Sequence, residues 1–272
     1  MPLNTLLATP VYDVILRDSR AAILFVSAPL WDVVAPAVAD NPYIRQVVVI
    51  GDAPEGMTSF DGFIKDSPTV ESAAVSKDEV AFWLYSSGST GQPKGVRLSH
   101  NNLISGGMNT AIAHQLSEDD RAICSLPLYH INALCVTLLA PLVSGGSVVF
   151  TEKFSTTQFW QNIRDTNCTW FSLVPTQIGY LLNDKSLPLD LPNLRFGRSA
   201  SAPLSPDIQS AFESRFNVPI IETMGLTETA AQILSNPLPP AVRKIGSPGI
   251  AFGNEVQIVD TNNQAVAADV EG

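Results

Sequence analysis

The stretch best suited to bind a ligand runs from Tyr85 to His100 and reads YSSGSTGQPKGVRLSH. It follows an apolar segment and combines glycines with hydroxyl side chains and the ammonium group of Lys94. Backbone N–H groups of such a loop, hydroxyl groups and an ammonium all suit phosphate oxygens, most of all where a strand, the loop and a helix N-terminus follow in that order. An ordinary surface turn or a flexible linker is the alternative, although a linker would not place Pro93 and Lys94 at one fixed position.

The loop does not match the nucleotide-binding pattern GxxxxGK[ST]. Pro93 stands where that pattern has a glycine, and Gly95 follows Lys94 in place of a hydroxyl residue. A kinase or GTPase of the P-loop type is therefore disfavoured.

Segments typical of strands alternate with segments typical of helices along the chain. These strands and helices would position the loop. Short β-branched runs closed by turn residues predict strands, and helical spacing after a serine or proline predicts helices. The predicted strands are 21–27, 44–52, 80–86, 145–150, 168–174, 194–200, 218–225 and, as an antiparallel strand, 254–260, with a surface connection over 53–77. The predicted helices are 28–42, 99–116, 154–167, 175–184 and 205–216. This alternation predicts an α/β fold of mostly parallel sheets covered by helices.

The composition limits the class of protein. The 272 residues are 45% hydrophobic and 15% charged, which favours a globular chain with a large core, and the net charge of −10 argues against nucleic-acid binding. Prolines and glycines interrupt the charge-free region 122–151, so its apolar runs are shorter than the ~20 residues of a membrane-spanning helix. Without a signal-peptide pattern, and with only three scattered cysteines (Cys124, Cys135 and Cys168), a cytoplasmic location without a membrane span is expected.

Other ionisable residues have simpler interpretations. Glu118, Asp119 and Asp120 are typical of a solvated acidic turn. His100 and His114 are expected at the start and on a face of a helix.

The segment YSSGSTGQPKGV resembles the signature [Y/F]-[T/S]-SGSTG-x-PKGV of the adenylate-forming superfamily, which includes acyl-CoA synthetases, luciferases and peptide-synthetase adenylation domains. Four further segments are similar to family motifs in the family's order: LPLYH at 126–130, RSASAPL at 198–204, TMGLTETA at 223–230 and RKIGSPG at 243–249. The resemblance spans almost the whole chain. It implies part of the layered N-terminal domain of these enzymes.

The resemblance implies that ATP activates a carboxylic acid as an acyl-adenylate, and that the thiol of CoA then displaces AMP. The β- and γ-phosphates would be held by Ser86, Ser87, Gly88, Ser89, Thr90, Gly91 and Lys94. The rest of the nucleotide would contact Ser199, Ala200, Ser201, Ala202, Thr223, Met224, Gly225 and Thr227. Glu228 would hold Mg²⁺, and Lys94, Thr227, Glu228 and His130 would be the catalytic residues. Met224 departs from the aromatic residue that is usual in the family, which predicts weaker nucleotide binding.

The sequence is most similar in pattern to acyl-CoA synthetases of the oxalate and 4-coumarate type, through segments such as SNPLPP. The histidine of the oxalate branch falls on Ala231, which argues against oxalate itself. The prediction is a small or medium acyl or aryl acid. Its pocket would be formed by His130, Asn132, Ala133, Ser199 and Ala231.

The family pattern also predicts a domain organisation. Residues 1–78 would be a partial first α/β subdomain, 79–240 the central nucleotide- and acyl-binding subdomain, and 241–272 the start of a β-rich subdomain. The motifs of the lysine-bearing C-terminal domain do not occur in the sequence. The expectation is that the isolated chain binds nucleotide but forms the adenylate slowly or not at all.

Two other functions stay open at this stage. A peptide-synthetase adenylation domain would load a carrier protein, but the acidic residue that such domains place early in their pocket segment is missing between 124 and 146. A non-catalytic nucleotide-binding fragment is the other alternative. The expected partners are ATP and a small carboxylic acid, with a homodimer as an open possibility.

Overall fold

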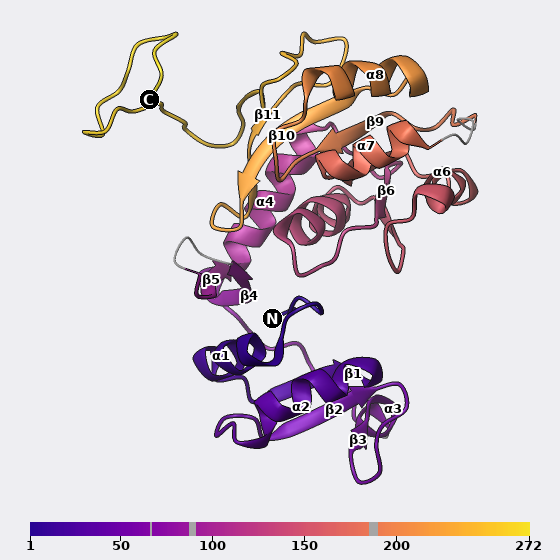
Figure 1. Ribbon diagram of the computed structural model, residues 1–272, viewed down its shortest axis with the longest axis vertical. Coiled ribbons are helices and arrows are strands. Elements are labelled where there is room, and N and C mark those ends of the chain that lie inside the picture. The colour runs from indigo at the N-terminus through magenta and orange to yellow at the C-terminus, as the bar shows by residue number, and fades with distance from the viewer. Residues whose placement is uncertain (66, 87–90, 185–189) are drawn as a thin grey trace. The chain divides into compact units, whose positions relative to one another are not determined.

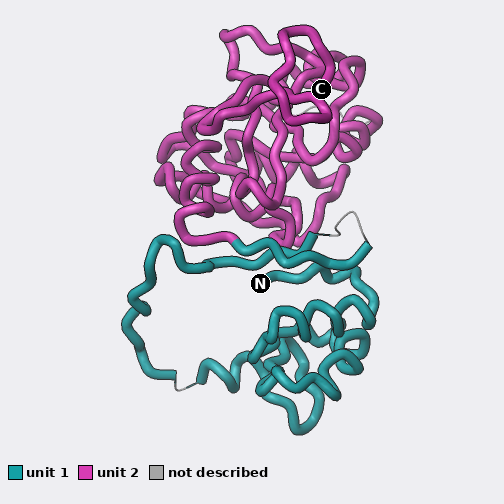
Figure 2. Tube along the Cα trace, turned by 90° about the vertical axis from the view of Figure 1, so that its left-hand side faces the viewer, with its two compact units in different colours: residues 1–97 teal, residues 98–272 magenta. Residues whose placement is uncertain are grey.

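The computed structural model describes residues 1–65, 67–86, 91–184 and 190–272. The chain forms two compact units, residues 1–97 and residues 98–272, which have different colours in Figure 2. The subdomain boundaries proposed from the sequence, near residues 78 and 240, stay predictions.

The first unit is built on a small parallel sheet of order β1-β2-β3. Its core is formed by Tyr12 and Leu16 of α1, Val34 of α2, and Val26 and Val49 of β1 and β2. The elements of this sheet and its helices are α1 (Thr9–Ser19), β1 (Ile23–Ser27), η1 (Ala28–Leu30), α2 (Trp31–Ala39), β2 (Gln46–Ile50), β3 (Thr58–Ser59) and α3 (Phe60–Ile64). Part of the predicted surface connection is thus ordered as β3 and α3. A separate two-stranded sheet pairs β4 (Val80–Ser86) with β5 (Lys94–Ser99).

The second unit contains a seven-stranded sheet of order β12-β11-β10-β9-β8-β6-β7. Neighbouring strands from β7 to β10 run parallel, and β11 and β12 are antiparallel additions at one edge. The strands are β6 (Arg121–Cys124), β7 (Ser147–Phe150), β8 (Trp170–Leu173), β9 (Phe196–Ser199), β10 (Ile220–Leu226), β11 (Ala231–Ser235) and β12 (Ile250–Ala251). The predicted class, mostly parallel sheets covered by helices, is confirmed.

Helices α6 (Thr156–Asp165), α7 (Pro175–Asn183) and α8 (Pro206–Phe216) supply one side of the main core (Figure 1). Trp160, Ile178 and Phe212 from these helices pack with Phe171 of β8 and Ile220 of β10. Burial of such large side chains contributes roughly 1.5–3 kcal/mol each, which is why the amphipathic helices dock on this sheet.

Helix α4 (His100–Ala113) and the π-helical stretch η2 (Asn132–Leu139) pack together, and η2 continues into α5 (Ala140–Val143). The predicted serine cap is confirmed, because Ser99 Oγ accepts a hydrogen bond from Asn102 N at 3.1 Å. The charge-free region 122–151 contains most of β6, then η2, α5 and β7. No helix in the described part of the chain is long and apolar enough to cross a membrane.

Two sequence expectations are wrong. The segment 254–260 forms no strand and makes only an isolated bridge between Val259 and Ala265. Its alternating residues Val256 and Ile258 are 46% and 57% exposed, so they gain no burial that would hold a strand. The acidic turn is also not fully solvated, because Asp120 is only 2% exposed.

Candidate nucleotide and acyl site

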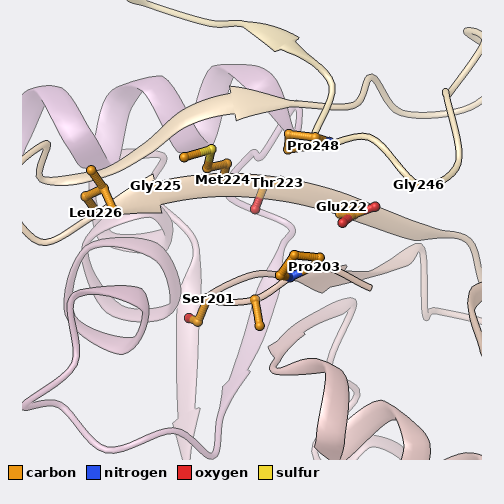
Figure 3. A pocket seen from close by; sticks show the side chains of 10 residues that line it. Ser201, Pro203, Glu222, Thr223, Met224, Gly225, Leu226, Gly246 and Pro248 are labelled. Carbon is orange, nitrogen blue, oxygen red and sulfur yellow. The ribbon is translucent and has the colours of Figure 1, made fainter. Parts of the chain in front are cut away.

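A pocket of about 360 Å³ lies along β10 in the second unit (Figure 3). It is formed by the loop after β9, by β10 itself and by the segment after β11. The lining residues are Ser201, Ala202, Pro203, Glu222, Thr223, Met224, Gly225, Leu226, Gly246 and Pro248. The structure therefore brings together two segments that the sequence assigned to the nucleotide, 201–202 and 223–225. The volume of the pocket is in the range of small-molecule sites.

The pocket opens where β10 changes its pairing. Its first half pairs in parallel with β9, and its second half pairs with β11 in antiparallel fashion, with a bulge between Met224 and Gly225. Gly225 is required at this point because a Cβ atom there would lie 1.8 Å from the carbonyl oxygen of Ala231. The bulge leaves Met224 42% exposed, so its thioether faces the open side of β10.

The predicted nucleotide-binding segment 199–202 is split between buried and exposed residues. Ser199 and Ala200 are buried, and the Thr223 hydroxyl donates to the Ser199 carbonyl oxygen at 3.3 Å. Ser201 has a φ of 74°, which turns the chain outward so that Ser201 and Ala202 line the pocket. Only the second half of this motif is therefore placed to contact a ligand in the pocket.

Glu222 is a pocket residue that the sequence analysis missed. One carboxylate oxygen accepts from the backbone N–H of Leu204 at 3.0 Å, and the other has no hydrogen-bond partner among the described residues. A buried acceptor of this kind suits an N–H donor of a ligand. The sequence feature that could have identified Glu222 is a glutamate three residues before Gly225, inside a strand whose preceding residues are apolar.

Thr227 and Glu228 lie in the turn between β10 and β11. Thr229 Oγ1 accepts from Leu226 N at 3.0 Å, which fixes this turn. Glu228 is exposed, and no cluster of three or more His, Cys, Asp or Glu occurs in the described ranges. A single exposed carboxylate fits a Mg²⁺ ion whose other ligands are phosphate oxygens and water.

Three of the predicted acyl-pocket residues lie on elements that pack against each other, Asn132 and Ala133 on η2 and Ala231 on β11. Ser199 ends β9. Asn132 accepts from the Ser172 hydroxyl at 3.0 Å and from Arg198 at 2.8 Å. Ala133 follows Asn132 in the chain, and Ala231 precedes Gln232. Both alanines are buried, and neither lines the pocket on β10. These residues stay predicted contacts of the acid.

His130 lies before η2 and packs against Tyr129 with ring centroids 4.6 Å apart. Burial lowers its pKa, so the imidazole is mostly neutral at neutral pH. A neutral imidazole can accept a proton or a hydrogen bond. Its catalytic role stays a prediction.

Arg198 is the second residue that the sequence analysis missed, since it was considered only as the first residue of the motif RSASAPL. Its side chain is fully buried and donates to Asn132, to Ser172 Oγ at 3.1 Å and to Gln232 Oε1 at 3.4 Å. The sequence feature that could have identified Arg198 is an arginine inside a predicted interior strand, two residues before Ala200.

The predicted phosphate loop belongs to the first unit. Ser87, Gly88, Ser89 and Thr90 lie outside the described residues. Ser86 ends β4, and Gly91 has a φ of 77°. Lys94 is exposed and begins β5, so the expected helix N-terminus does not follow the loop directly. Helix α4 starts only at His100, and the helix-dipole part of the phosphate-binding argument is therefore wrong for this loop.

Comparisons with known proteins identify the family of the chain. Residues 1–272 match the model of the AMP-binding enzyme family. The chain is 50% identical over 182 residues to the sulfoacetate–CoA ligase of Cupriavidus necator (67% of this chain, 36% of that protein), and 33% identical over 273 residues to the oxalate–CoA ligase of Arabidopsis thaliana (97% and 52%).

A crystal structure of an anthranilate CoA ligase in complex with anthranoyl-AMP superposes with a TM-score of 0.91 at 30% identity. That superposition covers 98% of this chain and 52% of the other protein. The chain thus spans about a third to a half of the length of these relatives. With its whole length matching one family model, the chain belongs to the AMP-binding enzymes.

Proposed function

We propose that this chain provides the nucleotide- and acyl-binding part of an AMP-forming acid:CoA ligase. The observation that carries the proposal is the pocket on β10, where two separate segments predicted to bind the nucleotide come together. The orphan oxygen of Glu222 offers an acceptor for an amino group such as that of adenine. The small side chains of Ser201 and Ala202 let a flat ring approach the backbone.

In the proposed reaction, a carboxylate oxygen of the acid attacks the α-phosphorus of ATP and pyrophosphate leaves. The thiol of CoA then attacks the acyl carbon and AMP leaves. Both partners of the first step are anions, so the protein must neutralise charge and fix their geometry. Lys94 with Ser86 to Gly91 would hold the outer phosphates, and Thr227 would donate to the α-phosphate. Bound Mg²⁺ would supply positive charge to the phosphates beside Glu228.

The acid is proposed to be small or medium in size, in line with the relatives. Two of them are named for sulfoacetate and oxalate, and a solved neighbour is named for anthranilate. His130, Asn132, Ala133, Ser199 and Ala231 are the proposed contacts of the acyl group. A cytoplasmic location and a homodimer stay predictions.

Calorimetric titration with a non-hydrolysable ATP analogue tests the nucleotide site. We expect Ala202→Trp, which fills the pocket, to weaken binding by at least about tenfold, because a ligand cannot share the space with an indole ring. Ala241→Trp is the matched control, since Ala241 is exposed and outside the pocket. Equal binding by both variants would place the nucleotide elsewhere.

Acid-dependent exchange between ATP and labelled pyrophosphate tests the chemistry. For the 272 residues alone, slow exchange with a small carboxylic acid, followed by thioester formation on addition of CoA, is the expected result. Exchange without thioester formation would favour the carrier-loading alternative. Nucleotide binding without exchange would favour a binding role.

A further inference from the structure

Arg198 carries a positive charge into the interior of the second unit. The residue is only 2% exposed. Its three hydrogen-bond acceptors, on Asn132, Ser172 and Gln232, are all neutral amides or hydroxyls. The ion pairs of the described residues involve other arginines, so Arg198 has no carboxylate partner there. A buried charge without a counter-ion is unfavourable for stability, because neutral dipoles replace its hydration only in part.

The same cluster contains hydrogen-bond donors that are not used. Arg198 Nε and Asn132 Nδ2 are buried and have no partner within the part of the chain that the structure describes. Asn132 Oδ1 is already occupied by Arg198 and Ser172. The unused groups of Arg198 and Asn132 are thus donors next to a cation, and such a pair attracts an anion with acceptor oxygens.

The neighbouring titratable groups do not compensate this charge. Burial lowers the pKa of His114 to about 3, assisted by the positive charge of Arg198, and His114 is therefore neutral at neutral pH. Arg195 is paired with Asp120, with Nη1 2.5 Å from Oδ2. Burial also lowers the pKa of Arg198 itself to about 9, which still leaves the guanidinium charged at neutral pH. A net positive charge therefore remains at this place.

The position of the cluster connects it with the acyl site. Asn132 begins η2 next to Ala133, and Gln232 follows Ala231 on β11. Asn132, a proposed contact of the acid, thus itself accepts a hydrogen bond from Arg198. The proposed contact Ala231 is the chain neighbour of Gln232, which also accepts from Arg198. A group at one end of a small acid would meet the guanidinium if its activated carboxylate lay nearer the nucleotide.

Building on the function proposed above, we propose that Arg198 binds a second acidic group of the substrate. The substrate would be a small acid that carries a carboxylate or sulfonate in addition to the carboxylate that is activated. Asn132 Nδ2 would donate to the same group. Arg198 would then act as the residue that selects doubly acidic substrates.

The test is calorimetric titration of the 272-residue chain with matched acids, with and without the non-hydrolysable ATP analogue. The pairs are oxalate and oxamate, malonate and malonamate, and sulfoacetate and methylsulfonylacetate, because each pair differs in one charge and little in size. We expect at least one doubly acidic member to bind about tenfold or more tightly than its partner. A ratio within twofold for all three pairs, including the case in which no acid binds, would overturn the proposal.

Variants separate recognition from a structural role. Arg198→Met should reduce the affinity ratio between the doubly acidic acid and its partner to within twofold. Arg198→Lys should keep part of this ratio. Arg195→Met is the matched control, since it removes a nearby arginine that already has a carboxylate partner. A ratio that survives in Arg198→Met would overturn the proposal.

The NMR signal of Arg198 Nε–Hε keeps the test decisive if Arg198→Met does not fold. We expect this signal to move when the doubly acidic ligand is added to the unchanged protein and to stay when its partner is added. A signal that does not move would overturn the proposal. If only the ATP analogue failed to bind, the proposed ligase function would be contradicted. The affinity ratios of the matched acids would still test the role of Arg198.

Discussion

Arg243 and Glu213 form a two-point salt bridge, with Nη1 2.5 Å from Oε1 and Nη2 3.0 Å from Oε2. Arg243 Nη1 also donates to the carbonyl oxygen of Ile220 at 2.9 Å, at the start of β10. The segment that follows Arg243 contributes Gly246 and Pro248 to the pocket. The salt bridge therefore holds one side of the pocket against α8 and β10.

Loss of this salt bridge should destabilise the second unit. We expect Glu213→Gln to lower the free energy of unfolding by about 1–3 kcal/mol, because a largely buried charge-assisted pair is lost. Urea unfolding measures this, with Glu255→Gln at an exposed position as the control. Equal stability of the two variants would contradict the assigned role.

The salt bridge between Arg243 and Glu213 should also make the free energy of unfolding depend on pH. Burial alone would raise the pKa of Glu213, but hydrogen bonds from Arg243, Gln209 and the backbone N–H of Ile220 outweigh it and lower the pKa. A lowered carboxyl pKa contributes stability that is present above the unfolded value and is lost as the pH falls through the folded value. The difference between the native protein and Glu213→Gln should therefore shrink in acid.

His114 should make the protein less stable at mildly acidic pH. Its imidazole is buried between aromatic rings, with its centroid 5.3 Å from that of Phe196, and burial lowers its pKa to about 3. The unfolded chain takes up this proton near pH 6.5, so stability falls as the pH drops from 6.5 toward 3. At pH 4.5 the expected loss is on the order of 2 kcal/mol.

Urea unfolding between pH 7 and 4.5 tests this, with His114→Phe as the variant that cannot titrate. Arg195 and Arg198 are the charged groups near His114. The pKa of Arg198 is lowered by burial only to about 9, so its guanidinium stays protonated over this range. The pKa of Asp120 is also lowered, from an ordinary value of 3.8. Its contribution to stability is therefore lost mainly below pH 3.8, outside the range from pH 7 to 4.5 in which His114 is tested. The same pH slope in both proteins would show that His114 is not responsible.

Gly225→Ala should damage the pocket. Its Cβ would lie 1.8 Å from Ala231 O, so the bulge between β10 and β11 must shift. We expect a loss of about 1–3 kcal/mol in stability and weaker nucleotide binding. Gly179→Ala on α7 is a sharp control, because its Cβ meets nothing within 4 Å and alanine favours a helix by roughly 0.5–1 kcal/mol.

Met224→Tyr should strengthen nucleotide binding. An aromatic ring stacked on a base gains about 0.5–1.5 kcal/mol, which corresponds to a roughly two- to tenfold lower Kd. Titration with the ATP analogue measures this change, and Val242→Tyr, at a residue that is 92% exposed, controls for added aromatic surface. Unchanged or weaker binding would mean that Met224 does not face the base.

Much of the fold could be predicted because the parallel strands are short, apolar and closed by turn residues. Trp170 to Leu173 and Phe196 to Ser199 were located in this way. The strand β5 and the absence of a strand at 254–260 could not be predicted, because each depends on whether a partner strand or a core lies beside it. Local pattern does not contain that information.

The sequence by itself determined the family, through a twelve-residue motif and four others in order, and it determined the α/β class through its periodicity. Only the tertiary structure decided which motif residues share a pocket, because Ser201 and Met224 meet through the pairing of β9 with β10 and the bulge before Gly225. It also decided that Arg198, Asn132 and Gln232 form one buried cluster. Burial and hydrogen-bond partners are properties of packing between strands and helices, and residue spacing along the chain does not specify them.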